Sequence, residues 1–364
     1  MTGPLRGVRV VELLGLGPGP FCGMLLADLG AEVIRVERPG SSKVDVLGRG
    51  RRSLALDLKS PGAAATVLDL VATADALIEG FRPGVAERLG VGPEACLKRN
   101  PRLVYGRMTG WGQDGPYAAT AGHDVNYIAI AGALGAIGPA DGPPVLPLNL
   151  LGDFGGGGML LAVGLLAALL HARATGEGQV VDAAIVDGTA TLTALIHGLV
   201  AGGRWNPGRG GNFLDGTAPY YTTYRCADGA YVAVGALEDK FWDALLDGLG
   251  RPSLSEDPAF LSDRTDPAHW PAIRARLASM FAQRSRAGWM AVFEGTDACV
   301  SPVHEPAEAA ADPHLRARST FVDIAGVVQP APAPRFSVTV PDLPHPAPAP
   351  GQDSASVLAE LGRN

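Results

Sequence analysis

Cysteine is scarce in this chain of 364 residues, which has only Cys22, Cys96, Cys226 and Cys299. The four lie far apart and form neither a CxxC pair nor a dense disulfide pattern. The N-terminal residues also lack the long apolar region of a signal peptide. We therefore expect a protein of the reducing cytoplasm.

Excess basic charge is absent as well. The chain has 30 Lys and Arg against 37 Asp and Glu, a formal net charge of −7 and a pI of about 5.5. This balance argues against nucleic acid or an anionic membrane surface as a partner of the whole molecule. Any anion that binds must meet a local basic patch. With 47% hydrophobic residues, the chain has ample material for a core, and its length suits two domains.

Long apolar runs are few, and one of them resembles a membrane span. Residues Phe154 to Leu170 carry no charge, but this length is at the lower limit for crossing a bilayer. Four consecutive glycines and the bounding Asp153 and His171 favour a helix buried between protein layers. We expect no membrane span.

The first forty residues read as a β-α-β unit. Val8–Leu13 is a buried strand, Leu14–Pro20 a glycine-proline turn, Phe21–Leu29 a helix and Ala31–Val36 a second strand. The alternation continues with strands predicted at Ser53–Leu58, Ala76–Glu79 and Leu103–Arg107 and helices at Pro61–Thr73 and Val85–Leu89. The pattern predicts an α/β fold with a largely parallel, doubly wound sheet.

A dinucleotide fingerprint is missing from the first turn. In Gly15–Pro20, proline replaces the third glycine of GxGxxG, and two prolines remove amide donors that would hold a pyrophosphate. A tight strand-to-helix connection explains the turn better than a nicotinamide site. Arg38, directly after Glu37 at the end of the second strand, suits a phosphate on a ribose, as in coenzyme A or NADP.

Basic residues are concentrated after Arg38, and they include Lys43, Arg49, Arg51, Arg52, Lys59, Arg82 and Arg88. For Lys43 or Arg49 alone, we favour a position on the solvated surface, with scattered ion pairs, over a role in binding a ligand. For Arg38, Lys59 and Arg88 we favour an anionic ligand, because strand ends and the following loops form ligand sites in open sheets.

The second half of the chain predicts a smaller α+β domain. Pro219–Cys226 and Ala230–Gly235 flank an Asp-Gly turn, which indicates a hairpin. Three helical segments follow. We expect a large domain at 1–187 and 329–364, linkers at 188–217 and 306–328, and a small domain at 218–305.

His123 and Asp153 are the candidate catalytic residues, since each lies beside glycine, where backbone can approach a ligand closely. An imidazole and a carboxyl group on opposite sides of one carbon can remove and return a proton, as inversion next to a carbonyl requires. The alternatives are structural: a core histidine bonded to a carbonyl group, and an aspartate that caps the helix beginning at Phe154.

Several motifs carry a resemblance that covers nearly the whole chain. They include Val10–Leu13, Gly17–Pro20, Leu56–Lys59, Glu79–Gly84, Gly110–Gln113, Gly122–Tyr127, Gly152–Gly155, Gly176–Gln179, Pro219–Tyr221 and Gly235–Glu238. In these runs the chain resembles the α-methylacyl-CoA racemases of the family III CoA-transferase superfamily. The resemblance implies a Rossmann-like large domain, a small domain and an interlocked homodimer in which each chain threads through its partner.

The resemblance also implies an acyl-CoA substrate, no metal and no cofactor. His123 and Asp153 become the proton-transfer residues, and Glu238 becomes the partner of the histidine, from its own chain or the other one. Asp239 and Lys240 differ from the usual residues after that glutamate. The residues implied in binding coenzyme A are Arg38, Leu56, Asp57, Leu58, Lys59, Arg82, Arg88, Gly122, Asp124, Val125, Asn126 and Tyr127.

The expected reaction interconverts (2R)- and (2S)-2-methylacyl-CoA through an enolate, stabilised by the backbone amides of Phe154–Gly158. Two alternatives stay open. In a family III CoA-transferase, Asp153 would attack the thioester and carry the acyl group as an anhydride. In a silent acyl-CoA-binding protein, no deuterium would enter the substrate. The preferred acyl chain does not follow from the sequence.

Overall fold

A computed structural model describes residues 2–13, 15–40, 46–251, 254 and 256–363. The chain forms two compact units. Unit 1 consists of Met1–Ala131, Pro147–Thr193 and Pro313–Asn364, and unit 2 of Gly132–Leu146 and Ala194–Asp312. Lys43, one of the basic residues considered above, lies outside the described residues.

Unit 1 is built on a parallel sheet of six strands in the order β3-β2-β1-β4-β5-β6. This is the strand order of a doubly wound Rossmann-type sheet, so the predicted fold class is confirmed. The strand bounds are β1 Arg9–Leu13, β2 Glu32–Glu37, β3 Arg51–Ala55, β4 Ala76–Glu79, β5 Val104–Thr109 and β6 Gln179–Ala184.

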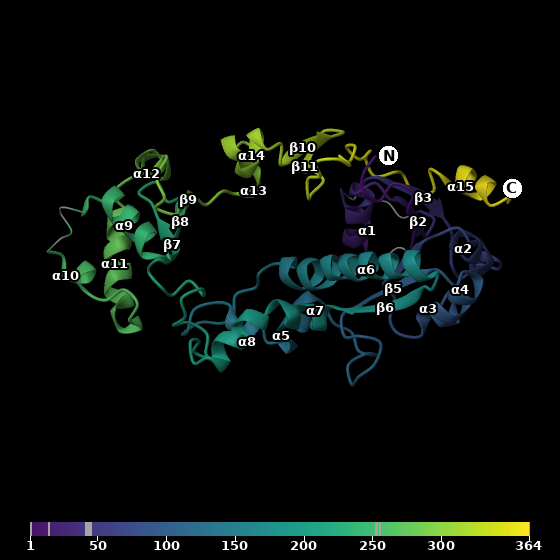
Figure 1. Ribbon diagram of the computed structural model, residues 1–364, viewed down its shortest axis with the longest axis horizontal. Helices are drawn as coiled ribbons and strands as arrows, with labels where there is room; N and C mark the ends of the chain where they lie inside the picture. Colours follow the sequence, from purple (N-terminus) through teal and green to yellow (C-terminus); the bar gives the residue numbers. More distant parts are fainter. Residues whose placement is uncertain (1, 14, 41–45, 252–253, 255, 364) are drawn as a thin grey trace. The chain divides into compact units, whose positions relative to one another are not determined.

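Helices cover both faces of this sheet, which explains why β1, β4 and β5 are almost entirely buried, including the charged residues Glu12, Glu79 and Arg107. In Figure 1, α6 lies along β5 and β6, with which it is in contact. The helical elements of unit 1 are α1 Pro18–Asp28, η1 Val46–Gly48, α2 Ala63–Val71, α3 Val85–Arg88, α4 Pro93–Arg99, α5 Asp124–Ile130, the π-helix η3 Leu150–Met159, α6 Leu160–Thr175, α7 Ile185–Leu192, α14 Pro313–Ala317 and α15 Ser354–Glu360.

The sequence predicts that the glycine-rich helix begins at Phe154, but the helix begins earlier in the structure. The helix begins at Leu150 as the π-helix η3 and continues as α6, so Asp153 lies inside the first turn. From Leu150 to Thr175 this is the one helix of the described residues that is long and apolar enough to span a membrane. The sequence predicts a helix enclosed between protein layers, but only one face is covered: Leu161 and Leu165 are buried, whereas Leu170 is 71% exposed.

Two arginines of the basic segment are buried, so the prediction of a solvated Arg49 is wrong. The Arg49 guanidinium pairs with Asp28 at 2.5 Å between Nη2 and Oδ2. Arg51 is fully buried and donates from Nε to Oε2 of Glu12 at 2.7 Å. It also donates to the carbonyl group of Pro20 in α1. These pairs join α1 to the sheet.

The C-terminal part of unit 1 returns to the sheet. The hairpin of β10 Phe321–Ile324 and β11 Val327–Pro330 is bonded to Arg49 through the Pro330 carbonyl oxygen, 2.7 Å from Nη1. The amide of Ser53 in β3 donates to Asp353, the residue before α15, at 2.8 Å. Val357 of α15 is buried in the core on this side of the sheet. The closing helix α15 therefore lies against the sheet of unit 1.

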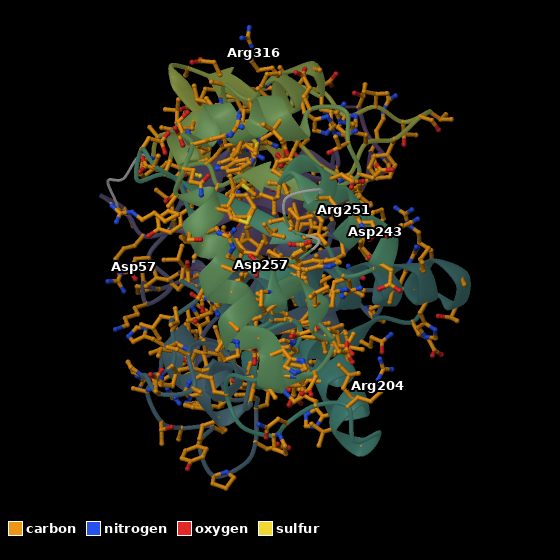
Figure 2. The ribbon with its side chains drawn as sticks, turned by 90° about the vertical axis from the view of Figure 1, so that its left-hand side faces the viewer. Asp57, Arg204, Asp243, Arg251, Asp257 and Arg316 are labelled. Atoms are coloured by element: carbon orange, nitrogen blue, oxygen red, sulfur yellow. The ribbon has the colours of Figure 1, made fainter. Side chains whose placement is uncertain are left out.

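Unit 2 contains an antiparallel sheet in the order β7-β8-β9, and Gly229 takes a positive φ of 83° in the turn of the predicted hairpin. Tyr224 stacks on Phe281 with 5.0 Å between ring centroids, in an aromatic core. Figure 2 shows Arg251 beside Asp243, with which it pairs at 2.7 Å. The elements of unit 2 are η2 Leu134–Ala136, α8 Ala194–Ala201, β7 Tyr221–Arg225, β8 Tyr231–Gly235, α9 Asp239–Gly248, α10 Pro258–Leu261, η5 Pro267–His269, α11 Trp270–Phe281, α12 Arg286–Phe293, β9 Val300–Pro302 and α13 Pro306–Ala309.

Candidate active site

A cavity of about 420 Å³ opens at the carboxyl ends of the parallel strands of unit 1. Leu13 and Thr109, at the ends of β1 and β5, and Ile185, the residue after β6, form part of its wall. The chain order reverses between β1 and β4, and ligands of open α/β sheets bind in the crevice at such a point. Both His123 and Asp153 line this cavity.

His123 is held at the start of α5. It is the N-cap residue in an extended conformation, and its backbone N–H donates to the side-chain Oδ1 of Asn126 at 3.0 Å. The side chain is exposed. The alternative of a buried core histidine is therefore wrong, and the ring is accessible to a substrate.

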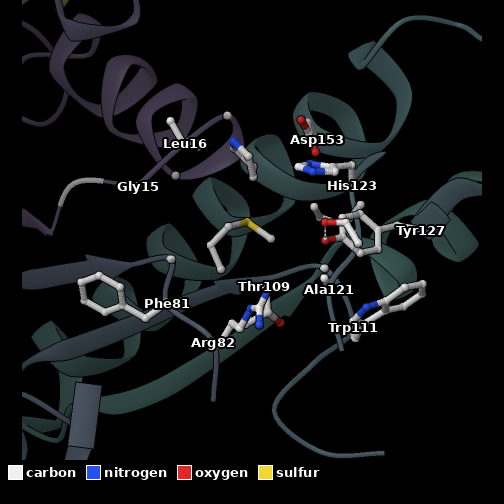
Figure 3. Close-up of a pocket in the computed structure, with 18 of the residues that line it drawn as sticks. Gly15, Leu16, Phe81, Arg82, Thr109, Trp111, Ala121, His123, Tyr127 and Asp153 are labelled. Carbon is white, nitrogen blue, oxygen red and sulfur yellow. Dashed lines mark hydrogen bonds between the residues drawn. The ribbon is translucent and has the colours of Figure 1, made fainter. Parts of the chain in front are cut away.

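Asp153 approaches the same cavity from the first turn of η3. Burial is the largest influence on its carboxyl group and raises the pKa; a hydrogen bond from Asn149 lowers it, and the charge of Asp124 raises it again. Asn149 Nδ2 lies 3.3 Å from Oδ2. Figure 3 shows the Asp153 side chain next to the ring of His123. A carboxyl group with a raised pKa beside an imidazole can donate and accept protons in the same cavity.

The helix boundary removes two of the expected roles for this segment. Asn149, not Asp153, is the N-cap residue of η3. The amide of Phe154 donates to the carbonyl oxygen of Asn149 at 3.3 Å. Because that amide is engaged in the helix, it is not a free donor for an enolate oxygen, and the assignment of Phe154 to that role is wrong.

Aromatic residues form the wall beside His123. The ring of Tyr127 packs edge-on against Trp111 at 4.7 Å, and its hydroxyl group donates to the carbonyl oxygen of Gly122 (Figure 3). A side chain at Gly110 would overlap the Tyr127 ring. Burial raises the pKa of the Tyr127 hydroxyl group, so it remains a donor. Tyr127 thus fixes the residue before His123.

A second cavity of about 350 Å³ lies at the ends of β2 and β3. Its lining contains the group of residues that the sequence assigns to coenzyme A: Arg38, Leu56, Asp57, Leu58 and Lys59. The predicted strand Ser53–Leu58 ends at Ala55, so residues 56–58 are free to line this cavity. Phe81 lines both cavities.

The remaining predicted residues are distributed unequally. Gly122, Tyr127 and Arg82 line the larger cavity. The side chains that line neither of these two cavities are Arg88, Asp124, Val125 and Asn126. Glu238 belongs to unit 2, where it is the exposed N-cap residue of α9.

Sequence reasoning missed several apolar residues of the larger cavity. Leu16 and Met108 line it, and Leu16 is 91% exposed. It also missed Asn149 as a partner of Asp153. The rule that strand ends form ligand sites could have indicated Met108, which lies near the end of β5. Local sequence gave no signal for Asn149, because its role depends on where the helix begins.

Comparison with known proteins extends these observations to nearly the whole chain. The sequence model of CoA-transferase family III matches residues 5–354. The chain is 47% identical over 361 residues to the alpha-methylacyl-CoA racemase of Mus musculus, covering 98% of this chain and 93% of the relative. It is 45% identical over 362 residues to the Homo sapiens racemase, with the same coverage.

A solved structure gives the same result. The crystal structure of a CAIB/BAIF family protein from Brucella suis is similar with a TM-score of 0.87 and 30% identity, covering 99% of this chain and all (100%) of that one. The motifs, the strand order and these similarities agree. The chain therefore belongs to CoA-transferase family III.

Proposed function

We propose that this protein is an α-methylacyl-CoA racemase, which interconverts (2R)- and (2S)-2-methylacyl-CoA thioesters. The observation that carries this proposal is that His123 and Asp153 line one cavity at the topological switch point of the sheet. Relatives with 45% and 47% identity over 98% of the chain bear that name.

The reaction requires an acidic C–H next to a thioester carbonyl. For one enantiomer, His123 accepts the α-hydrogen as a proton, and the C–H electron pair becomes part of the enolate. Protonated Asp153 then donates its proton to the opposite face of the same carbon, which forms the new C–H bond. For the other enantiomer the roles are exchanged, with Asp153 as the base and His123 as the acid.

The raised pKa of Asp153 supports its role as a proton donor. Its position in the first turn of a helix opposes that role, because the positive end of the helix dipole favours the carboxylate. The same dipole favours negative charge on the enolate oxygen. Burial and the neighbouring Asp124 both raise the pKa of the carboxyl group and therefore act against the dipole.

Coenzyme A is proposed to reach from the larger cavity to the second one. Arg38 and Lys59 in the second cavity supply positive charge for the phosphates of the nucleotide. Arg82 lines the larger cavity, nearer the reacting end. We assign Glu238 as the partner of His123 from the resemblance. Val125, Asn126 and Arg88 stay weaker candidates, because they line neither cavity.

We also propose an interlocked homodimer in which residues 188–217 and 306–328 are linkers between the large domain, 1–187 with 329–364, and the small domain, 218–305. The apolar helix α8 supports this, since none of its residues is buried and Leu195 is 63% exposed. The four free cysteines support a reducing, cytoplasmic location.

The competing reaction is acyl transfer, in which the Asp153 carboxylate attacks the thioester and forms a mixed anhydride. The two reactions are separated by incubating the protein with a single enantiomer of 2-methylacyl-CoA, with and without a labelled free acid as acceptor. Racemisation without the acceptor supports our proposal. Label that enters a new thioester, without epimerisation of the substrate, would replace it with the transferase.

A further inference from the structure

Asp124 is the residue next to His123, but it contacts Asp153. It begins α5, and its side chain is only partly exposed. An acidic residue in this position normally stabilises its own helix by interacting with the helix dipole. Here Oδ1 accepts a hydrogen bond from the backbone N–H of Asp153, at 2.6 Å. Hydrogen bonds of this length with a charged acceptor are among the stronger ones in proteins.

Gly152 is required for this close approach. A Cβ atom at Gly152 would overlap Oδ1 of Asp124 and lie 2.8 Å from Cγ2 of Ile128. The start of η3 therefore packs closely against α5 where the Asp124 carboxylate accepts the hydrogen bond from the Asp153 amide. The sequence Gly152-Asp153 and the side chain of Asp124 form a single contact between two helix starts.

Through this contact, one residue, Asp124, links the two proton-transfer residues His123 and Asp153. His123 is joined to Asp124 by a peptide bond. Asp153 is joined to Asp124 by the hydrogen bond that its backbone N–H donates to Oδ1. We propose that Asp124 is a positioning residue, whose carboxylate holds His123 and Asp153 at fixed places in the cavity. This inference rests on the proposed racemase function, because it assigns a part in that reaction.

The charge of Asp124 has a second effect on the same site. It is one of the causes that raise the pKa of the Asp153 carboxyl group, after burial, whereas His123 lowers it. From the β1–α1 turn, the uncharged Gly17 faces Oδ2 of Asp153. On α5, Tyr127 interacts with the charges of Asp153 and Arg82. The acidic residue of α7, Asp187, lies on an exposed position.

Two substitutions separate position from charge. In Asp124→Asn, the amide oxygen can still accept the bond from Asp153, but the charge is lost. In Asp124→Ala, both are lost. Glu94→Ala is the matched control, because Glu94 is an exposed acidic residue in the first turn of α4. Exchange of the α-hydrogen with deuterium is measured for each enantiomer of a 2-methylacyl-CoA separately, against pH.

We expect Asp124→Ala to lower kcat for both enantiomers by about 10²-fold with little change in KM, as displacement of a reacting group by 1 Å does. Asp124→Asn should retain most of the kcat. Its pH profile should change, because loss of the Asp124 charge lowers the pKa of Asp153. For the enantiomer in which Asp153 donates the proton, the rate should therefore fall at a lower pH than in the wild type. Glu94→Ala should behave like the wild type.

An Asp124→Ala protein with wild-type kcat would overturn the proposal. Equal losses of kcat in Asp124→Asn and Asp124→Ala with an unmoved pH profile would also overturn it, because neither the retained hydrogen-bond acceptor nor the lost charge would then have an effect. If the Asp124→Ala variant does not fold, the pH profile of Asp124→Asn tests the proposal: a shift to lower pH supports it, and an unmoved profile overturns it. Failure of the proposed function itself is distinct, because the wild type would then take up no deuterium from either enantiomer.

Discussion

At the scale of single residues, the site depends on two side chains in different surroundings. His123 is exposed at a helix start, whereas Asp153 is half-buried in the first turn of η3. Two titratable groups whose surroundings differ in this way can hold one proton between them and exchange roles. Glycine supplies the space: Gly110 and Gly122 make room for Tyr127, and Gly152 for Asp124.

The raised pKa of Asp153 predicts opposite pH dependences for the two enantiomers. Where Asp153 must donate, the rate falls as pH rises through its pKa, because the acid form disappears. Where Asp153 must accept, the rate rises over the same range, because the carboxylate forms. Initial rates of deuterium uptake, measured for each enantiomer across the range in which the protein stays folded, test this. Parallel profiles for the two enantiomers would contradict it.

At the scale of elements, η3 and α7 pack closely because Gly156 and Gly188 have no side chains at their contact. A Cβ atom at Gly188 of α7 would overlap the carbonyl oxygen of Gly156. We therefore expect Gly188→Ala to force the two helices apart and to lower the free energy of unfolding by about 1–3 kcal/mol. Denaturant unfolding measures this. Gly135→Ala is the control, because nothing lies within 4 Å of a Cβ atom there, and equal stability of both variants would refute the packing argument.

The buried pair of Arg51 and Glu12 joins β3, β1 and α1. Oε1 of Glu12 has no hydrogen-bond partner in the described part of the chain, so this carboxylate depends on Arg51 for its compensation. Arg51→Met should lower the free energy of unfolding by about 3–5 kcal/mol, since it leaves a buried charge unpaired. Adding Glu12→Gln should restore part of the loss. If the double variant is no more stable than Arg51→Met, the charge is not the cause.

At the scale of the whole molecule, much of the fold follows from local sequence. β4 is predicted at its observed bounds, and β1, β2 and β5 within one or two residues, because each contains adjacent hydrophobic residues between turns. β3 is predicted poorly, since it begins with Arg51, whose burial depends on Glu12 39 residues away. Pairings between distant residues leave no local pattern.

The candidate site could be predicted only in part, for the same reason. His123 and Asp153 are found because a glycine directly precedes each of them in the sequence. The contacts of Asp153 with Asp124 and Asn149 were not foreseen, because they depend on the helix beginning at Leu150. The strand-end rule indicates the place of both cavities, but not which apolar side chains fill the walls.

The apolar surface of α8 and of the outer face of α6 predicts a partner copy. Analytical ultracentrifugation should give twice the chain mass of 37.4 kDa. Leu195→Glu in α8 should weaken the association, since it puts a charge in an apolar interface. Leu261→Glu in α10, where the leucine is also exposed, should not. An active protein that is monomeric at all concentrations would contradict the interlocked dimer.

Proton NMR in deuterium oxide tests the central claim most directly. A pure (2R)- and a pure (2S)-2-methylacyl-CoA are incubated separately with the wild type and with His123→Ala. We predict that the wild type converts both to the same mixture with one deuterium at C2. His123→Ala should lose about 10²–10⁴-fold in the rate of exchange from at least one enantiomer, with nearly unchanged thermal stability because the side chain is exposed. No deuterium uptake by the wild type, or unchanged exchange from both enantiomers in the variant, would contradict the account.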